Sequence, residues 1–110
     1  MLPKKEVKGE HVYITGAGSG IGRTMAIKLA EMGARISCVD LDGAAANETA
    51  REITSAGGDA IGLQCDVTSS SDVTHSGTEA RMKYGPVTIL INNAGIVSGK
   101  KILDNKEQTI

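Results

Sequence analysis

The chain has 110 residues, 40% of them hydrophobic and 23% charged, and its net charge is −1. This length suits one domain with a modest core, and the balanced charge excludes the basic surface that nucleic-acid binding requires. No apolar run approaches the roughly 20 residues that cross a bilayer, and no secretory signal pattern is present. We therefore expect a cytoplasmic chain with no membrane segment and no nucleic-acid partner.

The four residues with metal-binding or redox chemistry are too dispersed to predict a site. Cys38 and Cys65 lie in apolar, strand-like runs without CxxC spacing, which favours two buried thiols over a disulfide or a metal site. His11 and His75 have no second ligand at metal-binding spacing. We expect both histidines to be structural or surface residues, and no metal site.

Apolar periodicity and glycine or proline breaks divide the chain into alternating strands and helices. The expected strands cover residues 11–15, 35–39, 60–65 and 87–91, the last being the most plainly buried. The expected helices cover residues 19–32, 43–55 and 69–84, and a further helix opens near Asp104. Parallel strands joined by right-handed helical crossovers predict an α/β fold. It comprises the first four strands and three helices of a Rossmann-like, doubly wound parallel sheet in three α/β/α layers.

Two of these helices carry patterns from which a buried face can be predicted. In residues 19–32, apolar stripes run through positions 21, 25 and 29 and through positions 22, 26 and 30. In residues 69–84, weak helix formers leave only Val73, Ala80 and Tyr84 to define a buried face. Ser69 and Asp72 have the spacing of a capping box at the start of that helix.

The stretch Thr15–Gly22, with the sequence TGAGSGIG, joins the first strand to the first helix. A glycine-rich turn in this place lets backbone N–H groups approach an anion, and the helix N-terminus adds about half a positive charge. The strict pattern G-x-G-x-x-G fails because positions 21 and 23 hold Ile and Arg, and a P-loop fails at Ala17 and Arg23. The stretch predicts a phosphate-binding turn, with a purely structural tight turn as the alternative.

Each of the other three expected strands is followed by an Asp or an Asn. Asp40 follows the second strand, a position from which a carboxylate can accept both hydroxyls of an adenine ribose. Asp66 and Val67 follow the third strand, and the stretch Asn92–Gly95 follows the fourth. Ligands of open α/β sheets bind at the carboxyl ends of the strands, so these residues and the glycine turn together predict one dinucleotide site.

The TGAGSGIG turn, Asp66-Val67 and Asn92-Asn-Ala-Gly95, in this order and separation, resemble the short-chain dehydrogenase/reductase family. The resemblance extends from about residue 9 to residue 110. It implies that residues 1–110 are the N-terminal portion of a longer NAD(P)-binding Rossmann domain. Residues 2–5, 9–10 and 93–100 are also similar to the retinol and 17β-hydroxysteroid dehydrogenase branch, whose members often carry an N-terminal membrane anchor.

The resemblance also implies how the cofactor is bound: the turn borders the pyrophosphate and adjoining sugars, and the residues after the third and fourth strands border the adenine and a ribose. Together with Asp40 and its neighbour, the expected cofactor-binding residues are Gly16, Ser19, Gly20, Ile21, Gly22, Asp40, Leu41, Asp66, Val67, Asn93, Ala94 and Gly95. Thr15 and Asn92 are expected to brace the turn and the sheet through hydrogen bonds.

The charge around Asp40 favours NAD over NADP. A carboxylate welcomes the 2′-hydroxyl of NAD and repels the 2′-phosphate of NADP, by roughly 1 kcal/mol per charge pair at ~4 Å in water and about 4 kcal/mol at an effective dielectric constant of 20. Asp42 adds a second negative charge, and no Lys or Arg occupies positions 17 to 19 or 41. Arg23 falls inside the first helix and Arg35 at the far end of the second strand.

The chain lacks the residues with which the family performs hydride transfer, a Tyr-x-x-x-Lys pair with a Ser and an Asn. Tyr13 and Tyr84 are its only tyrosines, and Ala17 and Thr88 stand where a lysine would be needed. We therefore assign no catalytic residue and expect the N-terminal, dinucleotide-binding part of a homo-oligomeric oxidoreductase acting on small alcohol or carbonyl substrates. One alternative is a stand-alone NAD-binding sensor or scaffold. A remote alternative is an S-adenosylmethionine-dependent methyltransferase, against which the Asn92–Gly95 stretch argues.

Overall fold

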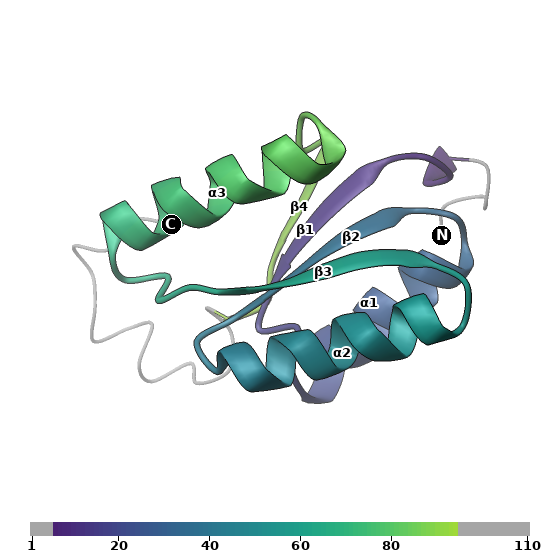
Figure 1. Ribbon diagram of the computed structural model, residues 1–110, viewed down its shortest axis with the longest axis horizontal. Helices are drawn as coiled ribbons and strands as arrows, with labels where there is room; N and C mark the ends of the chain where they lie inside the picture. Colours follow the sequence, from purple (N-terminus) through teal and green to yellow (C-terminus); the bar gives the residue numbers. More distant parts are fainter. Residues whose placement is uncertain (1–5, 95–110) are drawn as a thin grey trace.

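The computed structural model describes residues 6–94, in which four strands alternate with three helices (Figure 1). The elements are β1 (His11–Thr15), α1 (Gly20–Glu31), β2 (Arg35–Asp40), α2 (Gly43–Ser55), β3 (Asp59–Gln64), α3 (Ser70–Tyr84) and β4 (Ile89–Asn92). The strands form one parallel sheet in the order β3-β2-β1-β4. This arrangement confirms the predicted α/β fold. The helix expected near Asp104 lies outside the described residues.

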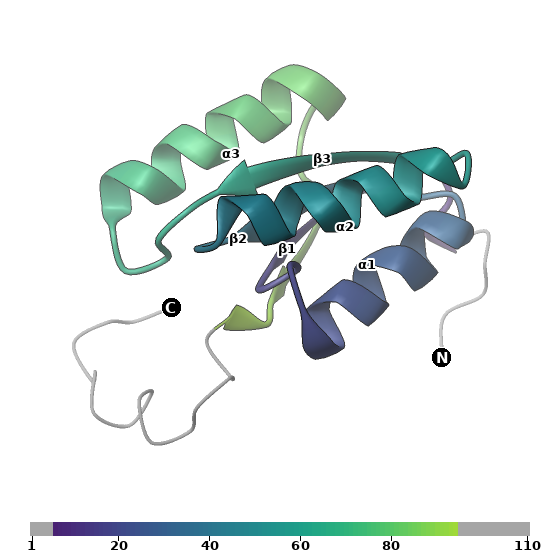
Figure 2. The same ribbon diagram turned by 60° about the horizontal axis from the view of Figure 1, so that its bottom comes forward.

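The helices cover the two faces of the sheet unequally. α1 and α2 lie side by side on one face and α3 lies on the other, so that the sheet is the middle of three layers (Figures 1 and 2). Each crossover between parallel strands is long enough for one helix, which is why helices and strands alternate along the chain. None of the helices within residues 6–94 is long and apolar enough to cross a membrane.

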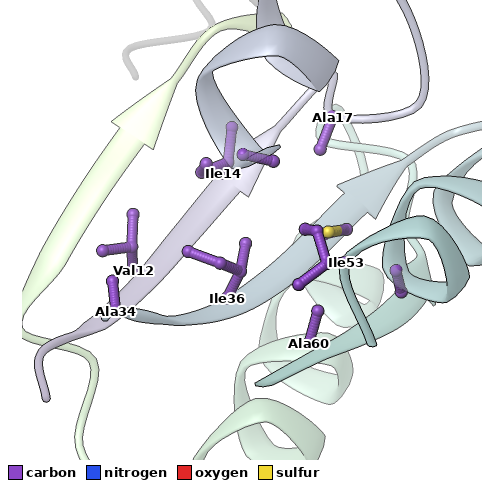
Figure 3. Packing of buried hydrophobic residues seen from close by; sticks show 10 residues of the cluster. Val12, Ile14, Ala17, Ala34, Ile36, Ile53 and Ala60 are labelled. Carbon is purple, nitrogen blue, oxygen red and sulfur yellow. The ribbon is translucent and has the colours of Figure 1, made fainter. Parts of the chain in front are cut away.

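The larger core fills the space between the sheet and the pair α1 and α2. Figure 3 shows its side chains meeting from β1, β2, β3 and α2. Its fully or nearly fully buried members are Val12, Ile14, Ala17, Ala26, Ala34, Ile36, Cys38, Ala50, Ile53 and Ala60. All five residues of β1 are buried, as predicted, because β1 is a central strand with helices on both faces.

The smaller core lies under α3 and is held partly by polar contacts. Tyr13, Val39, Cys65 and Ala80 form its buried cluster. The hydroxyl groups of Tyr13 and Ser76 lie 2.5 Å apart and are buried, which ties β1 to the middle of α3. Burial raises the pKa of the Tyr13 hydroxyl. Cys38 and Cys65 are both free and buried, on opposite sides of the sheet, which confirms the prediction of two buried thiols.

Hydrogen bonds join the start of β1 to the residue that precedes β4. The His11 N–H donates to the Thr88 hydroxyl at 3.1 Å, and the Thr88 N–H donates to the His11 carbonyl at 3.0 Å. The ring of His11 contacts the carbonyl oxygen of Gly85 through Nδ1 and the hydroxyl of Ser37 through Nε2. His11 is therefore a buried structural residue, and His75 is exposed on α3, as predicted for both.

The prediction that the fourth strand is the most buried was wrong. β4 begins at Ile89 rather than residue 87, and Leu90 is 65% exposed. The reason is its place in the sheet: within residues 6–94, β4 pairs with β1 and with no second strand. The most buried strand is β1.

The predicted face of α3 was also partly wrong. Val73 is 43% exposed, whereas Ser76 and Ala80 are buried. A serine can occupy this position because its hydroxyl has a buried partner on β1. Tyr84 is half-buried, packed edge-on against His11.

The capping box at the start of α3 forms only in one direction. The Ser69 hydroxyl accepts from the Asp72 N–H at 3.2 Å. The Asp72 carboxylate accepts from the Asp66 N–H at 3.1 Å, and the Ser69 N–H donates instead to the carbonyl of Asp66. The Asp72 carboxylate therefore accepts from the loop after β3, where a full capping box would have it accept from the N–H of Ser69.

Two further expectations, the bounds of the third strand and the apolar stripes of the first helix, were right in part. β3 covers Asp59–Gln64, one position earlier than predicted, so that Cys65 and Asp66 follow the strand. The predicted stripe through positions 22, 26 and 30 of α1 is confirmed, since Gly22 and Ala26 are buried and Ala30 packs against the core. The other predicted stripe was wrong at its start, because Ile21 is 68% exposed, whereas Leu29 packs against the core.

Candidate functional site

The residues predicted to bind the cofactor lie at one edge of the sheet, the edge formed by the carboxyl ends of the parallel strands. The glycine turn follows β1, Asp40 ends β2, Asp66 and Val67 come shortly after β3, and Asn93 and Ala94 follow β4. Gly95, the last of the predicted residues, lies outside the described residues. In open α/β sheets this edge is where ligands bind.

The inner side of the glycine turn packs against the end of β4 so closely that side chains are excluded. A Cβ atom on Gly22 would lie 2.1 Å from the Gly16 carbonyl oxygen and 2.6 Å from Nδ2 of Asn93. Gly16 also has a φ of 68°, in the left-handed region that favours glycine. Asn93 is 7% exposed, and its Nδ2 donates to the Gly16 carbonyl at 3.3 Å. The side chain of Asn93 therefore supports the turn from behind.

Thr15 and Asn92 brace the turn, as predicted. The Thr15 hydroxyl donates to Oδ1 of Asn92 at 3.0 Å and accepts from the Ala94 N–H at 3.0 Å. These two bonds join the carboxyl ends of β1 and β4 directly beneath the glycine turn.

The carboxylate of Asp40 is hydrogen-bonded to the glycine turn. Its Oδ2 accepts from the Gly18 N–H at 2.8 Å, and its Oδ1 accepts from the Asp42 N–H at 3.0 Å. A Cβ atom on Gly18 would lie 2.8 Å from that same Oδ2 and 2.6 Å from the Cβ of Ala45. An ionised carboxylate has about four acceptor positions, so two bonds leave capacity for ligand hydroxyls.

Sequence reasoning missed Thr49, a fully buried polar residue of α2. Its hydroxyl donates to the Ala17 carbonyl at 2.9 Å and accepts from the Arg23 guanidinium at 3.2 Å. The available signal was its spacing: Thr49 falls on the same helical face as Ala46, Ala50 and Ile53, where an apolar residue is expected.

The N-terminus of α1 is the part of the site that faces outward. Its N-cap residue, Ser19, makes no side-chain capping bond, whereas Asp42 caps α2 and Ser69 caps α3. The first helical hydrogen bond of α1 runs from the Arg23 N–H to the Ser19 carbonyl, so the preceding four amides have no acceptor within the helix. Ser19, Gly20 and Ile21 are exposed, and no acidic residue lies in the first turn. These amides can donate to an anion.

The remaining predicted residues border this N-terminus and the tips of β2 and β3. Leu41 is 64% exposed beside Asp40. Oδ1 of Asp66 accepts from both the N–H and the hydroxyl of Thr68, at 2.9 and 2.6 Å, which holds the carboxylate in its own loop. Val67 is half-buried.

Arg23, the cation of α1 nearest in sequence to the glycine turn, is committed to α2. Its guanidinium forms a salt bridge with Glu52 and donates to the Thr49 hydroxyl. The edge that carries Asp40 and Asp42 therefore receives no free positive charge from this residue.

A family profile described as "short chain dehydrogenase" matches residues 10–110. The chain belongs to the short-chain dehydrogenase family. Over 103 residues it is 41% identical to human epidermal retinol dehydrogenase 2, a match that covers 93% of this chain and 33% of the relative. This short-chain dehydrogenase chain thus spans about a third of the length of that curated relative.

Two solved structures share the arrangement of strands and helices. A hydroxysteroid dehydrogenase from Escherichia coli superimposes with a TM-score of 0.76 at 40% identity, covering 78% of this chain and 37% of the other. A protein from Haemophilus influenza with bound NAD, described as a "putative D-Mannonate oxidoreductase", superimposes with a TM-score of 0.74 at 28% identity, covering 76% of this chain and 30% of the other. Membership of the family implies a nicotinamide dinucleotide cofactor, and these matches give no support to a methyltransferase.

Proposed function

We propose that this chain is the N-terminal, NAD-binding part of a short-chain oxidoreductase that interconverts alcohols and carbonyls. The observation that carries the proposal is the uncapped N-terminus of α1, which presents exposed amides beside the carboxylate of Asp40. The family resemblance supports an alcohol or carbonyl substrate, and the names of the retinol and hydroxysteroid dehydrogenases it matches point to an apolar one.

The residues present fit a dinucleotide at this edge. The amides of Ser19 to Gly22 suit the pyrophosphate, and the absent side chains at Gly16 and Gly22 let the turn pack tightly enough to present them. Asp40 with Leu41 suits the adenine ribose, Asp66 and Val67 the adenine, and Ala94 and Gly95 the second ribose, with Asn93 behind the turn. When bound, the nicotinamide supplies a hydride donor or acceptor.

This segment supplies binding, and proton transfer to the substrate belongs to a part of the oxidoreductase outside residues 1–110. The two tyrosines are committed elsewhere. Tyr13 is buried against Ser76, and Tyr84 packs against His11 with Arg35 and Lys83 about its ring. Association into a homo-oligomer is part of the same proposal, on family resemblance.

We propose NAD rather than NADP because the charge at the tip of β2 is negative. Asp40 and Asp42 lie there, and Arg23 is paired with Glu52. At ~4 Å, each carboxylate would oppose a 2′-phosphate by roughly 1 kcal/mol in water and about 4 kcal/mol at an effective dielectric constant of 20.

Fluorescence titration with NADH and NADPH tests this proposal. We expect NADH to bind more tightly, and Asp40→Asn to reduce the preference by at least about fivefold because the charge is lost while an acceptor oxygen for the Gly18 N–H remains. The matched control is Glu48→Gln, which removes an exposed charge of α2 paired with Arg51. Tighter binding of NADPH by the unaltered chain would refute the cofactor assignment.

A further inference from the structure

The hydroxyl of Thr49 makes a contact that its own helix does not require. A threonine inside a helix ordinarily returns its hydroxyl hydrogen bond to a carbonyl of the preceding turn. Here the distance to that carbonyl, on Ala45, is 3.3 Å, and the distance to the carbonyl of Ala17 in the glycine turn is 2.9 Å. The shorter contact leaves the helix, and Thr49 is fully buried where it is made.

The peptide groups on both sides of Ala17 are therefore held by different elements. The Ala17 N–H donates to the Val39 carbonyl of β2 at 3.0 Å, the Ala17 carbonyl accepts from Thr49 of α2, and the next amide, of Gly18, donates to Asp40. The amides that face outward begin at the following residue, Ser19. Their direction depends on the orientation of the Ala17 and Gly18 peptides.

A second contact joins the start of α1 to the same hydroxyl. Arg23, at the end of the first turn of α1, donates to the Thr49 hydroxyl at 3.2 Å and forms a salt bridge with Glu52, one helical turn further along α2. Thr49, Arg23 and Glu52 thus form a cluster that we call the clasp. Its buried member, Thr49, contacts the glycine turn through Ala17 and α1 through Arg23.

We infer that Thr49 is a positioning residue for the dinucleotide, which acts by fixing the Ala17 carbonyl and thereby aiming the amides of Ser19 to Gly22. The inference deepens the proposed function and rests on it for the identity of the ligand. It assigns a role in binding to a residue of α2 that has no place in the glycine motif itself.

The decisive comparison is between Thr49→Val, which keeps the shape and removes the hydroxyl, and Thr49→Ser, which keeps the hydroxyl. We expect T49V to raise the Kd for NADH about tenfold, since a buried hydrogen bond is lost and a carbonyl is left without its partner, and T49S to restore affinity to within about twofold. Glu52→Gln, at the exposed end of the clasp, should raise the Kd for NADH about twofold. If T49V does not fold, this variant tests the inference in its place.

Two control variants separate positioning from general loss of stability. Ser76→Ala removes a buried hydroxyl that contacts Tyr13 on the opposite side of the sheet, so it should lower the Tm and leave the Kd for NADH unchanged. Thr54→Val removes a hydroxyl of the same helix that bonds only locally, to the Arg51 carbonyl, and should change neither quantity appreciably. A T49V variant that loses Tm while binding NADH as well as the unaltered chain would overturn the inference.

Hydrogen exchange of residues 15–23 in the ligand-free chain keeps this test independent of the ligand. Faster exchange in T49V but not in T49S or S76A supports positioning, and equal exchange in all three overturns it. Failure of the unaltered chain to bind NADH would refute the proposed function, and the exchange comparison would still decide whether Thr49 orders the turn.

Discussion

Gly22→Ala should perturb the site strongly, because the added methyl group meets the backbone of Gly16 as well as the buried side chain of Asn93. The new Cβ would lie 2.1 Å from the Gly16 carbonyl oxygen, so the turn and the helix must separate by about 0.9 Å to reach the 3.0 Å that Cβ contacts respect. The same atom would lie 2.6 Å from Nδ2 of Asn93, which displaces the support behind the turn.

Overpacking of this kind costs roughly 1–3 kcal/mol of stability. A displacement near 1 Å also spoils the aim of the exposed amides, and we expect at least about a tenfold loss of NADH affinity. Urea unfolding and fluorescence titration of the same preparations give the two quantities separately.

The matched control is Gly77→Ala in α3, where the nearest atom to the new Cβ is the flexible end of Arg81, at 3.4 Å. Replacing a glycine in a helix interior should stabilise the chain by roughly 0.5–1 kcal/mol and leave NADH binding unchanged. Wild-type affinity in G22A would refute the view that close packing of the turn on Asn93 shapes the site.

Three other outcomes are expected. Asp42→Asn should preserve stability because asparagine also caps a helix, yet it should narrow the preference for NADH over NADPH a few-fold, as paired titrations would show. Tyr13→Phe should cost about 1 kcal/mol in urea unfolding, because the buried bond to Ser76 is lost. Burial raises the pKa of the Cys38 thiol to about 12 from 9.0. The stability that this neutral thiol contributes is therefore complete below about pH 9 and lost as the pH approaches 12, so Cys38→Ala should lose stability less steeply over that range. An equally steep decline in C38A would contradict this.

The strands and helices could be predicted within about two residues because their signals are local. Alternation, helical spacing and glycine breaks act over a few neighbouring residues, and they located α2 at Gly43–Ser55 as the structure has it. The edge on which the predicted site residues gather also followed from the sequence, since parallel strands bring their carboxyl ends together.

What could not be predicted depends on partners far away in the chain. Ser76 is buried because Tyr13 lies 63 positions earlier, and Thr49 is buried because Ala17 lies 32 positions earlier. Leu90 is exposed because of the position of β4 in the sheet, which its own apolar sequence does not encode. The position of Asp40 at the end of β2 likewise does not predict that its carboxylate accepts from the N–H groups of Gly18 and Asp42.

The bonds between the glycine turn and the residues after β4 have a consequence for the order of assembly. The contacts of Asn93 with Gly16 and of Ala94 with Thr15 close loops of 77 and 79 residues, among the longest separations in the described fold. Closing such loops costs entropy before any contact compensates for it, so β1, α1 and β2 can form while these bonds are still absent. During synthesis, the turn emerges early but gains its backing only after residue 94 has left the ribosome. A dinucleotide would therefore act late in the folding of the described segment, as a ligand that stabilises the attachment of β4 to β1.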